Sequence, residues 1–520
     1  MSLPSKSLYH KFQKYLSFIG PGLVVSVAYL DPGNYSTSVS AGSSYRYKLC
    51  FVIFMSNLFA AVLQTLCIKL GTVTGLDLAE MCRLNLAPNL NMFMYICAEI
   101  AIIATDLAEV VGTAISLEIL FGIPLLYGVV ITVLDVLIIL MAYHKDGSLK
   151  QTKVFEIIVS ILVMATCACF ILELFKCNFE PGAAWGIFKG FLPVNKEVFK
   201  DKNALFISCG IVGSTVMPHS LFLGSALVQP RLKDYDVRNG KYDEAPVKSN
   251  TNQSLEPIES SLENSSSNSN PVPLSRLRRI SNGSMLLKKY KPSYSAIKYC
   301  LNYSYIELNL SLFFVAVFVN SAILIVAGAT LYGKPDAADA DLLSIYEMLS
   351  YYISPAAGLL FALSMLFSGQ SAGIVCTMAG QIIAEGFINW TIEPWKRRII
   401  TRIIAIVPVI IVIGILGREG VSKVMNSSQV VLSFILPIVS APLIYFTCKK
   451  EYMTVYDNEK DTAEETSPLL EQNRDVSKLN GKPINFANGG FLRISSILTW
   501  LIITALNIYL IIAFANGADI

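Results

Sequence analysis

Long apolar runs, each close to the length of a membrane-spanning helix, dominate the pattern of this 520-residue chain. A helix that crosses a bilayer needs about 20 predominantly apolar residues. The sequence therefore predicts an all-α polytopic membrane protein with about 11 transmembrane helices. The candidate spans lie near residues 18–42, 50–70, 92–119, 123–143, 154–174, 204–229, 302–332, 354–387, 399–417, 427–448 and 491–514.

Polar segments separate these spans and suggest how the chain is organised. Lysine and arginine gather in the N-terminal tail and in the loops after the even-numbered spans, which predicts a cytoplasmic N-terminus. Two polar cytoplasmic segments lack a core-forming pattern, and we expect them to be largely disordered. The expected divisions are a tail at 1–17, a first repeat at 18–174, a second repeat at 204–448 with a loop at 231–297, a linker at 450–488 and a last helix at 491–514.

Composition excludes several classes of function. The chain is 53% hydrophobic and 15% charged, whereas soluble domains are about 25% charged. Its net charge of +3 is too small to indicate a nucleic-acid partner. The 11 cysteines form no CxxC pair and only 3 histidines are present, which argues against a zinc module or a disulfide framework. With no nucleophile–base pair and no phosphate-binding loop, we expect neither an enzyme nor a cofactor.

Two of the apolar spans are interrupted at their centres. Asp31-Pro32-Gly33-Asn34 lies in the first span, and Met217-Pro218-His219 follows two glycines in the sixth. Proline removes a backbone donor and opens a helix, and such a break survives in a bilayer only where it lines a cavity or a bound ion. Breaks in spans one and six are what a 5+5 inverted repeat predicts, with the substrate held between the two broken helices.

The side chains at these breaks suggest a cation as that substrate. Asp31 offers a carboxylate, Asn34 an amide and Met217 a thioether. Oxygen ligands alone suit magnesium or calcium, whereas a thioether favours later transition metals. Met217 could instead simply fill a gap in the membrane core.

Further ligands come from the unwound backbone and from a neighbouring span. The carbonyls of Ala28 and Ser214, each three residues before a side-chain ligand, are expected to be free at the breaks. Gln429, like Asn57, Gln64 and Asn320, is a polar group inside a span, and most such groups form hydrogen bonds between helices. We expect it to be able to join the metal ligands.

The third span carries a row of acids. Glu99, Asp106 and Glu109 lie within about 80° of one helix face. Such a row is costly in a bilayer unless it conducts protons or is paired. Arg402 is a candidate partner, and His219 could relay protons because imidazole titrates near neutral pH. A static salt-bridge network is the alternative interpretation.

These features together resemble the natural-resistance-associated macrophage protein (Nramp) family of proton-coupled divalent metal transporters, over nearly all the spans. Gly224 is a departure, because many members carry a second histidine at that position. The resemblance is closest to fungal members, especially the vacuolar-membrane branch. It rests on Asp31-Pro32-Gly33-Asn34, Thr105-Asp106-Leu107-Ala108-Glu109, Met217-Pro218-His219, Ser368-Gly369-Gln370-Ser371 and Ser428-Gln429-Val430-Val431-Leu432-Ser433.

The resemblance implies a leucine-transporter-like fold, with manganese and ferrous iron as the usual substrates. The implied metal ligands are Asp31, Asn34, Met217, Gln429 and the carbonyls of Ala28 or Ser214. The implied proton pathway comprises Glu99, Asp106, Glu109 and the exit residue Arg402.

We therefore expect a proton-coupled importer of divalent metal into the cytosol, with Asp31 as both metal ligand and proton acceptor. Glu465, Leu469 and Leu470 form an acidic dileucine pattern, which a sorting adaptor could read and which favours the vacuolar membrane. Two other functions stay open: a metal-sensing receptor of transporter fold, and a sodium-coupled amino-acid carrier.

Overall fold

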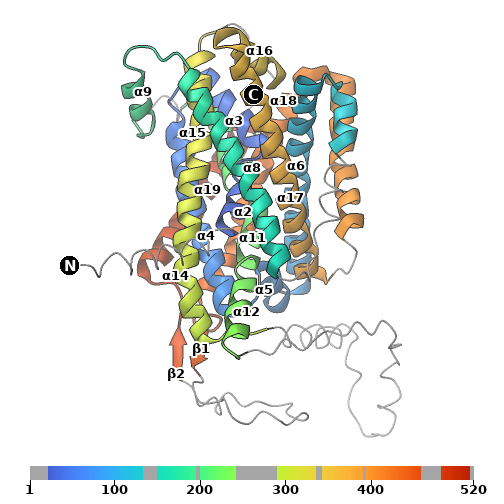
Figure 1. Cartoon of the computed structure of the whole chain (residues 1–520). Helices are drawn as coiled ribbons and strands as arrows, with labels where there is room; N and C mark the ends of the chain where they lie inside the picture. Colours follow the sequence, from blue (N-terminus) through green and yellow to red (C-terminus); the bar gives the residue numbers. More distant parts are fainter. Residues whose placement is uncertain are drawn as a thin grey trace, which may run out of the picture.

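The computed structural model is a bundle of long helices (Figure 1). It describes residues 21–132, 149–194, 200–241, 290–334, 342–389, 394–457 and 482–515. In the order of the first half of the chain, the helices are α2 (Pro21–Val27), α3 (Pro32–Tyr45), α4 (Cys50–Thr74), α5 (Leu78–Asn85), α6 (Pro88–Phe121), α8 (Leu149–Lys176), α9 (Ala183–Gly190), α10 (Lys202–Thr215), α11 (Pro218–Ala226) and α12 (Gln229–Arg238).

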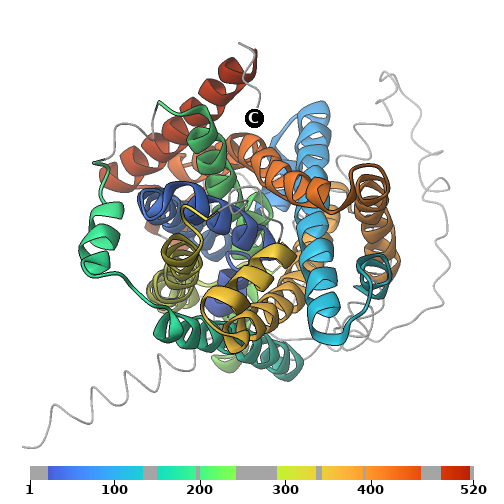
Figure 2. The ribbon, with the colours of Figure 1, turned by 90° about the horizontal axis from the view of Figure 1, so that it is seen from above.

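The second half of the chain continues the bundle and adds one small sheet. A π-helical turn, η2, joins α14 to α15 within a single span. The elements are α14 (Tyr294–Ser311), η2 (Leu312–Val317), α15 (Phe318–Thr330), α16 (Leu342–Tyr352), α17 (Pro355–Ile388), α18 (Pro394–Cys448), β1 (Thr454–Asp457), β2 (Lys482–Asn485) and α19 (Gly490–Ala515). Seen from above, α19 lies at the edge of the bundle (Figure 2).

Within the described residues, 8 helical stretches are long and apolar enough to cross a membrane. The other three expected spans differ for separate reasons. The first is divided into the short helices α2 and α3. The fourth begins as a helix at residue 125 and runs into residues that are not described. The ninth contributes the shorter apolar stretch Ile399–Ile411. The all-α class is confirmed, and the count of eleven spans stays a prediction.

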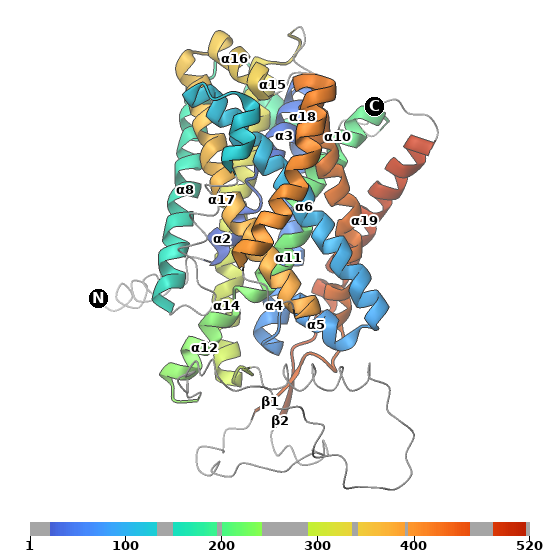
Figure 3. The same cartoon turned by 90° about the vertical axis from the view of Figure 1, so that its right-hand side faces the viewer.

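The ninth and tenth expected spans belong to one continuous helix. α18 is 55 residues long, and an ideal straight helix of that length would extend about 80 Å, far beyond the hydrocarbon core of a bilayer. Figure 3 shows instead that α18 rises along the bundle and then descends. Its internal prolines are Pro408, Pro437 and Pro442. No proline lies between the two expected spans, at residues 418–426, so no proline ends the helix there.

The polar segments at 231–297 and 450–488, expected to lack regular structure, contain it at their ends. α12 occupies the start of the first, and Asp236 accepts hydrogen bonds from the Tyr290 hydroxyl (2.5 Å) and the Ser293 amide (2.9 Å), which closes the base of the loop. β1 pairs antiparallel with β2 across the second, with Thr454 opposite Asn485. These hydrogen bonds and the strand pairing stabilise the ends of both polar segments, and a hydropathy pattern cannot predict such contacts.

The two ends of the bundle differ in what covers them. α12 and the β1–β2 pair lie together at the lower end in Figure 1, which we call the inner end. α9 and α16 lie at the opposite, outer end. Both polar segments therefore leave the bundle on the same side, as expected for loops that follow even-numbered spans.

Candidate metal site and acidic face

The two helix breaks have the same local chemistry. Ala28 lies four residues before Pro32, and Ser214 lies four residues before Pro218. In an α-helix each of these carbonyls would accept a hydrogen bond from the residue that is here a proline, and proline has no N–H. Each proline is the first residue of the helix that follows, α3 or α11. The sequence thus frees one backbone carbonyl at each break.

Asp31 and Asn34 connect the breaks to each other. The side-chain nitrogen of Asn34 donates to the Ser214 carbonyl (3.0 Å) and to Oδ1 of Asp31 (3.0 Å). Oδ1 also accepts from the Asn34 amide (3.0 Å), so Asp31 caps α3. The other carboxylate oxygen, Oδ2, is buried and has no hydrogen-bond partner among the described residues. An unsatisfied buried oxygen of this kind is what a bound cation would explain.

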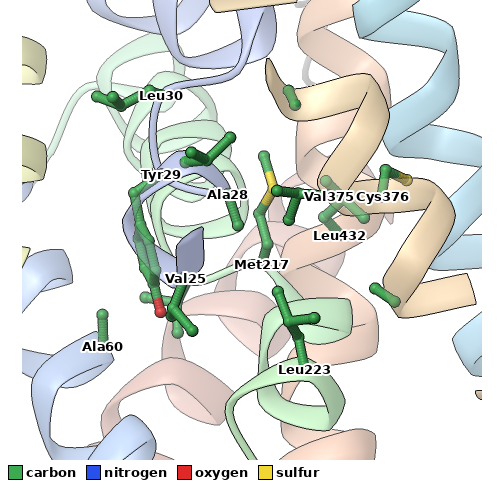
Figure 4. Close-up of a cluster of buried hydrophobic side chains, with 14 of the residues drawn as sticks. Val25, Ala28, Tyr29, Leu30, Ala60, Met217, Leu223, Val375, Cys376 and Leu432 are labelled. Carbon is green, nitrogen blue, oxygen red and sulfur yellow. The ribbon is translucent and has the colours of Figure 1, made fainter. Parts of the chain in front are cut away.

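Met217 lies between the breaks and the neighbouring helices. Its side chain is fully buried, and Figure 4 shows it with Ala28 on one side and Val375 and Leu432 on the other. The gap-filling interpretation also requires burial. The position of the sulfur opposite the first break is what favours a role as a ligand.

Gln429 of α18 contacts both breaks. A Cβ atom added at Gly33 would lie 2.2 Å from its side-chain nitrogen, and one added at Gly213 would lie 1.9 Å from its backbone carbonyl oxygen. Both positions therefore require glycine for this close approach. Oε1 of Gln429 is buried without a hydrogen-bond partner in the described part of the chain, so an amide oxygen is available beside Asp31.

Two side chains hold the first break open. The Ser368 hydroxyl of α17 donates to the Leu30 carbonyl, and the Asn320 amide of α15 donates to the Tyr29 carbonyl (3.0 Å). Asn320 thus makes the hydrogen bond between helices that its place inside a span predicted. Asn57, for which the same was expected, instead donates to the Ile53 carbonyl of its own helix (2.9 Å).

The acids of the third span separate into two groups along α6. Asp106 and Glu109 are fully buried, and their ligand atoms and the Cys376 sulfur all lie within 4.8 Å of one another. Glu99, about 10 Å further toward the inner end, forms an ion pair with Arg397 (2.5 Å). From the sequence we expected Arg402 to be the partner of these acids and assigned Arg397 to a loop. The structure instead pairs Arg397 with Glu99. The backbone of Arg402 lies in α18, but its side chain is outside the described set.

His219 lies next to this acidic face. Its ring is buried, and Nδ1 is 3.5 Å from the hydroxyl of Thr105, the residue before Asp106. A short path between the second break and the acids therefore exists. The structure leaves no room for a histidine at position 224. A Cβ atom added at Gly224 would lie 2.1 Å from Oε1 of Gln64.

The side chain of Gln64 fills the space beside Gly224 and links the two breaks. Its side-chain nitrogen donates to the Tyr29 hydroxyl (3.0 Å) and to the Ser220 carbonyl (3.0 Å).

The expected sorting residues Glu465, Leu469 and Leu470 are outside the described residues, as is the intramembrane acid Asp135.

Comparison with known proteins decides the family. A family model described as natural resistance-associated macrophage protein-like matches residues 22–463. The chain belongs to the Nramp family. This Nramp chain is 53% identical to the iron transporter SMF3 of Saccharomyces cerevisiae, over 98% of each protein. It is 46% identical to the manganese transporter SMF1 of the same yeast, over 96% of this chain and 86% of SMF1.

A more distant relative and a solved structure extend this result. The divalent metal cation transporter MntH of Nostoc sp. is 37% identical over 86% of each protein. A crystal structure of the Eremococcus coleocola manganese transporter, in complex with an aromatic bis-isothiourea substituted compound, is similar with a TM-score of 0.69 and 27% identity. The match covers 98% of this Nramp chain and 90% of that chain.

These matches confirm the resemblance that the motifs predicted, including its fungal character. The division of spans one and six at Pro32 and Pro218 also confirms the two broken helices. All the relatives named here are transporters, which agrees with the expectation that this Nramp chain is not an enzyme.

Proposed function

We propose that this Nramp chain is a proton-coupled secondary transporter that carries divalent transition metal ions, with manganese and ferrous iron as substrates, into the cytosol. One observation supports the proposal most directly. The two helix breaks meet through Asn34 and the Ser214 carbonyl (3.0 Å), beside a buried carboxylate oxygen of Asp31 that has no partner in the described residues. The relatives SMF1 and SMF3 are named as manganese and iron transporters.

The proposed ligands are Asp31, Asn34, Met217, Gln429 and the carbonyls of Ala28 and Ser214. One carboxylate supplies charge, the amide and backbone oxygens complete a hard ligand set, and the thioether discriminates against calcium and magnesium. For Asn34 to bind metal through its oxygen, its side chain must give up the hydrogen bonds it now donates. Metal binding would therefore replace the contact between the breaks.

Protons are proposed to use the same carboxylate and the adjacent acids. A proton and a metal ion compete for Asp31. Because Asp106 and Glu109 are buried side by side, we expect a proton released near Asp31 to pass through them toward Glu99 and then Arg402. His219 is a second route, since its ring reaches Thr105.

We further propose that the transporter resides in the vacuolar membrane. The acidic dileucine pattern at Glu465, Leu469 and Leu470 supports this location, with a sorting adaptor as the partner that reads it. The acidic lumen would then drive metal out into the cytosol.

The test is uptake of Mn²⁺ into proteoliposomes that contain the purified protein, with the internal pH read at the same time. We expect uptake with internal acidification, and loss of both in Asp31→Ala. Uptake without acidification would remove the proton role of the span-three acids. No uptake by folded protein would contradict the proposal and favour a metal-sensing receptor or another substrate.

A further inference from the structure

Glu173 is a buried acid that the metal site and the proton pathway do not use. It lies on α8, three residues before the end of the helix, and none of its surface is exposed. Both of its carboxylate oxygens are buried, and neither has a hydrogen-bond partner among the described residues. Most buried polar groups are hydrogen-bonded, so this carboxyl group requires an explanation.

Glu173 lines a small cavity of about 10 Å³, room for a single water molecule, near the outer end of the bundle. Residues of α3, α15, α16 and α17 complete the lining. They include Val39, Val326, Leu349 and Phe361. Val39 is eight residues beyond Asp31, so the cavity lies about 12 Å from Asp31 along α3 toward the outer end.

Among the described residues, the surroundings of Glu173 contain no group that could neutralise a negative charge. The cavity residues contributed by α3, α15, α16 and α17 are apolar. The titratable groups that interact with it are the Tyr35 hydroxyl of α3 and the thiols of Cys169 and Cys177 on its own helix. An isolated ionised carboxylate is very costly in such a place. This arrangement therefore accommodates the neutral acid far better than the carboxylate.

The same position lies on the outer side of the proposed metal site. We take outward opening to part the helices that line the cavity, because the cavity lies between Asp31 and the outer end. That separation admits water to the cavity, and a hydrated glutamate is ionised at neutral pH. An ionised carboxylate beside the entry path attracts cations and concentrates them locally.

We propose that Glu173 is a second cation-binding group, an entry site for divalent metal on the outer side of Asp31, which exchanges its proton for metal when the outer end opens. The proton leaves to the outer water as the carboxylate oxygens bind the ion. On closing, the metal moves to Asp31 and Glu173 takes up a proton again. This inference rests on the proposed transport function.

The experiment compares wild type, Glu173→Gln and Glu118→Gln in proteoliposomes. Initial rates of Mn²⁺ uptake are measured against Mn²⁺ concentration at outer pH 7.5 and 5.5, with the inner pH held constant. Glutamine has nearly the shape of the protonated acid and cannot ionise. Glu118, partly exposed near the outer end of α6, is the matched control because it is also a glutamate and does not line the cavity.

We expect Glu173→Gln to raise the KM for Mn²⁺ roughly threefold to tenfold at pH 7.5, with the maximal rate nearly unchanged, because local concentration of the cation is lost. The difference should shrink at pH 5.5, because protons favour the arrangement that holds the neutral acid over the open arrangement in which Glu173 is ionised. Glu118→Gln should behave like wild type. Equal KM values for Glu173→Gln and wild type at both pH values would overturn the inference while leaving the transport function standing. Absence of uptake by wild type would instead refute the transport function.

A second variant separates a role in transport from a role in packing. Glu173→Leu replaces an unpaired polar group with an apolar one, so we expect a higher melting temperature in detergent and weaker Mn²⁺ uptake. If Glu173→Leu transports with the KM of wild type, the acid is a packing residue and the inference is wrong.

Discussion

Replacing Asp31 by asparagine or by alanine should separate two roles that this side chain has on its two oxygens. Oδ1 accepts the hydrogen bonds that cap α3, and Oδ2, which has no partner in the described residues, is the oxygen that we assign to the metal. Asparagine caps a helix about as well as aspartate. Asp31→Asn therefore removes the charge and keeps the cap, whereas Asp31→Ala removes both.

The expected magnitudes follow from these contacts. Loss of an N-cap costs about 1 kcal/mol, so Asp31→Ala should be less stable than Asp31→Asn by that amount in the absence of metal. A ligand at 100 times its Kd stabilises the folded state by about 2.7 kcal/mol. Wild type should gain that much with Mn²⁺, and both variants should gain almost nothing.

The assay is thermal unfolding of the purified protein in detergent, with and without Mn²⁺, and with Mg²⁺ as the control ion. We expect a Mn²⁺-dependent rise in Tm for wild type alone, and an order of metal-free Tm values of wild type close to Asp31→Asn and above Asp31→Ala. A Mn²⁺-dependent rise of wild-type size in Asp31→Asn would refute the reasoning, because the charge on Asp31 would then not hold the ion.

Three further variants test other parts of the site. Met217→Ala should retain some Mn²⁺ flux but lose discrimination against Ca²⁺, measured by competition in the uptake assay; undiminished discrimination would remove its role as a ligand. Asp106→Asn should lower the number of protons that enter per metal ion, read from internal pH during uptake; an unchanged ratio would point to the His219 route. Gly224→Ala should displace Gln64 and lower stability by about 2–3 kcal/mol, roughly the worth of the hydrogen bonds that Gln64 makes. Adding Gln64→Ala to Gly224→Ala should cost less than the sum of the single changes, and strict additivity of the two Tm shifts would show that the residues do not interact.

The amino-acid sequence by itself determined the features that depend on local chemistry. Long apolar runs predicted the helices, and Pro32 and Pro218 predicted where two of them break. These inferences are reliable because a proline removes the same hydrogen bond whatever surrounds it. The carbonyls of Ala28 and Ser214 follow from the same rule, and the motifs around the breaks were enough to indicate the family.

The structure added what depends on the meeting of distant segments. Glu99 pairs with Arg397, which is 298 residues away, and Gln64 takes the space beside Gly224. No periodicity could select either partner, because several polar groups inside spans have equivalent local patterns. A signal for Glu173 was present, since an acid within an apolar span is a functional candidate by default.

Only the tertiary structure decided which of the described intramembrane acids are paired, which are grouped and which has no partner among the described residues. Glu99 forms an ion pair with Arg397, and Asp106 and Glu109 lie side by side. Glu173 lines a cavity whose other walls come from four other helices. The free energy of a buried charge is set by the groups within a few ångströms. Those groups come from helices far apart in the chain, so the role of each acid is settled only when the bundle closes around it.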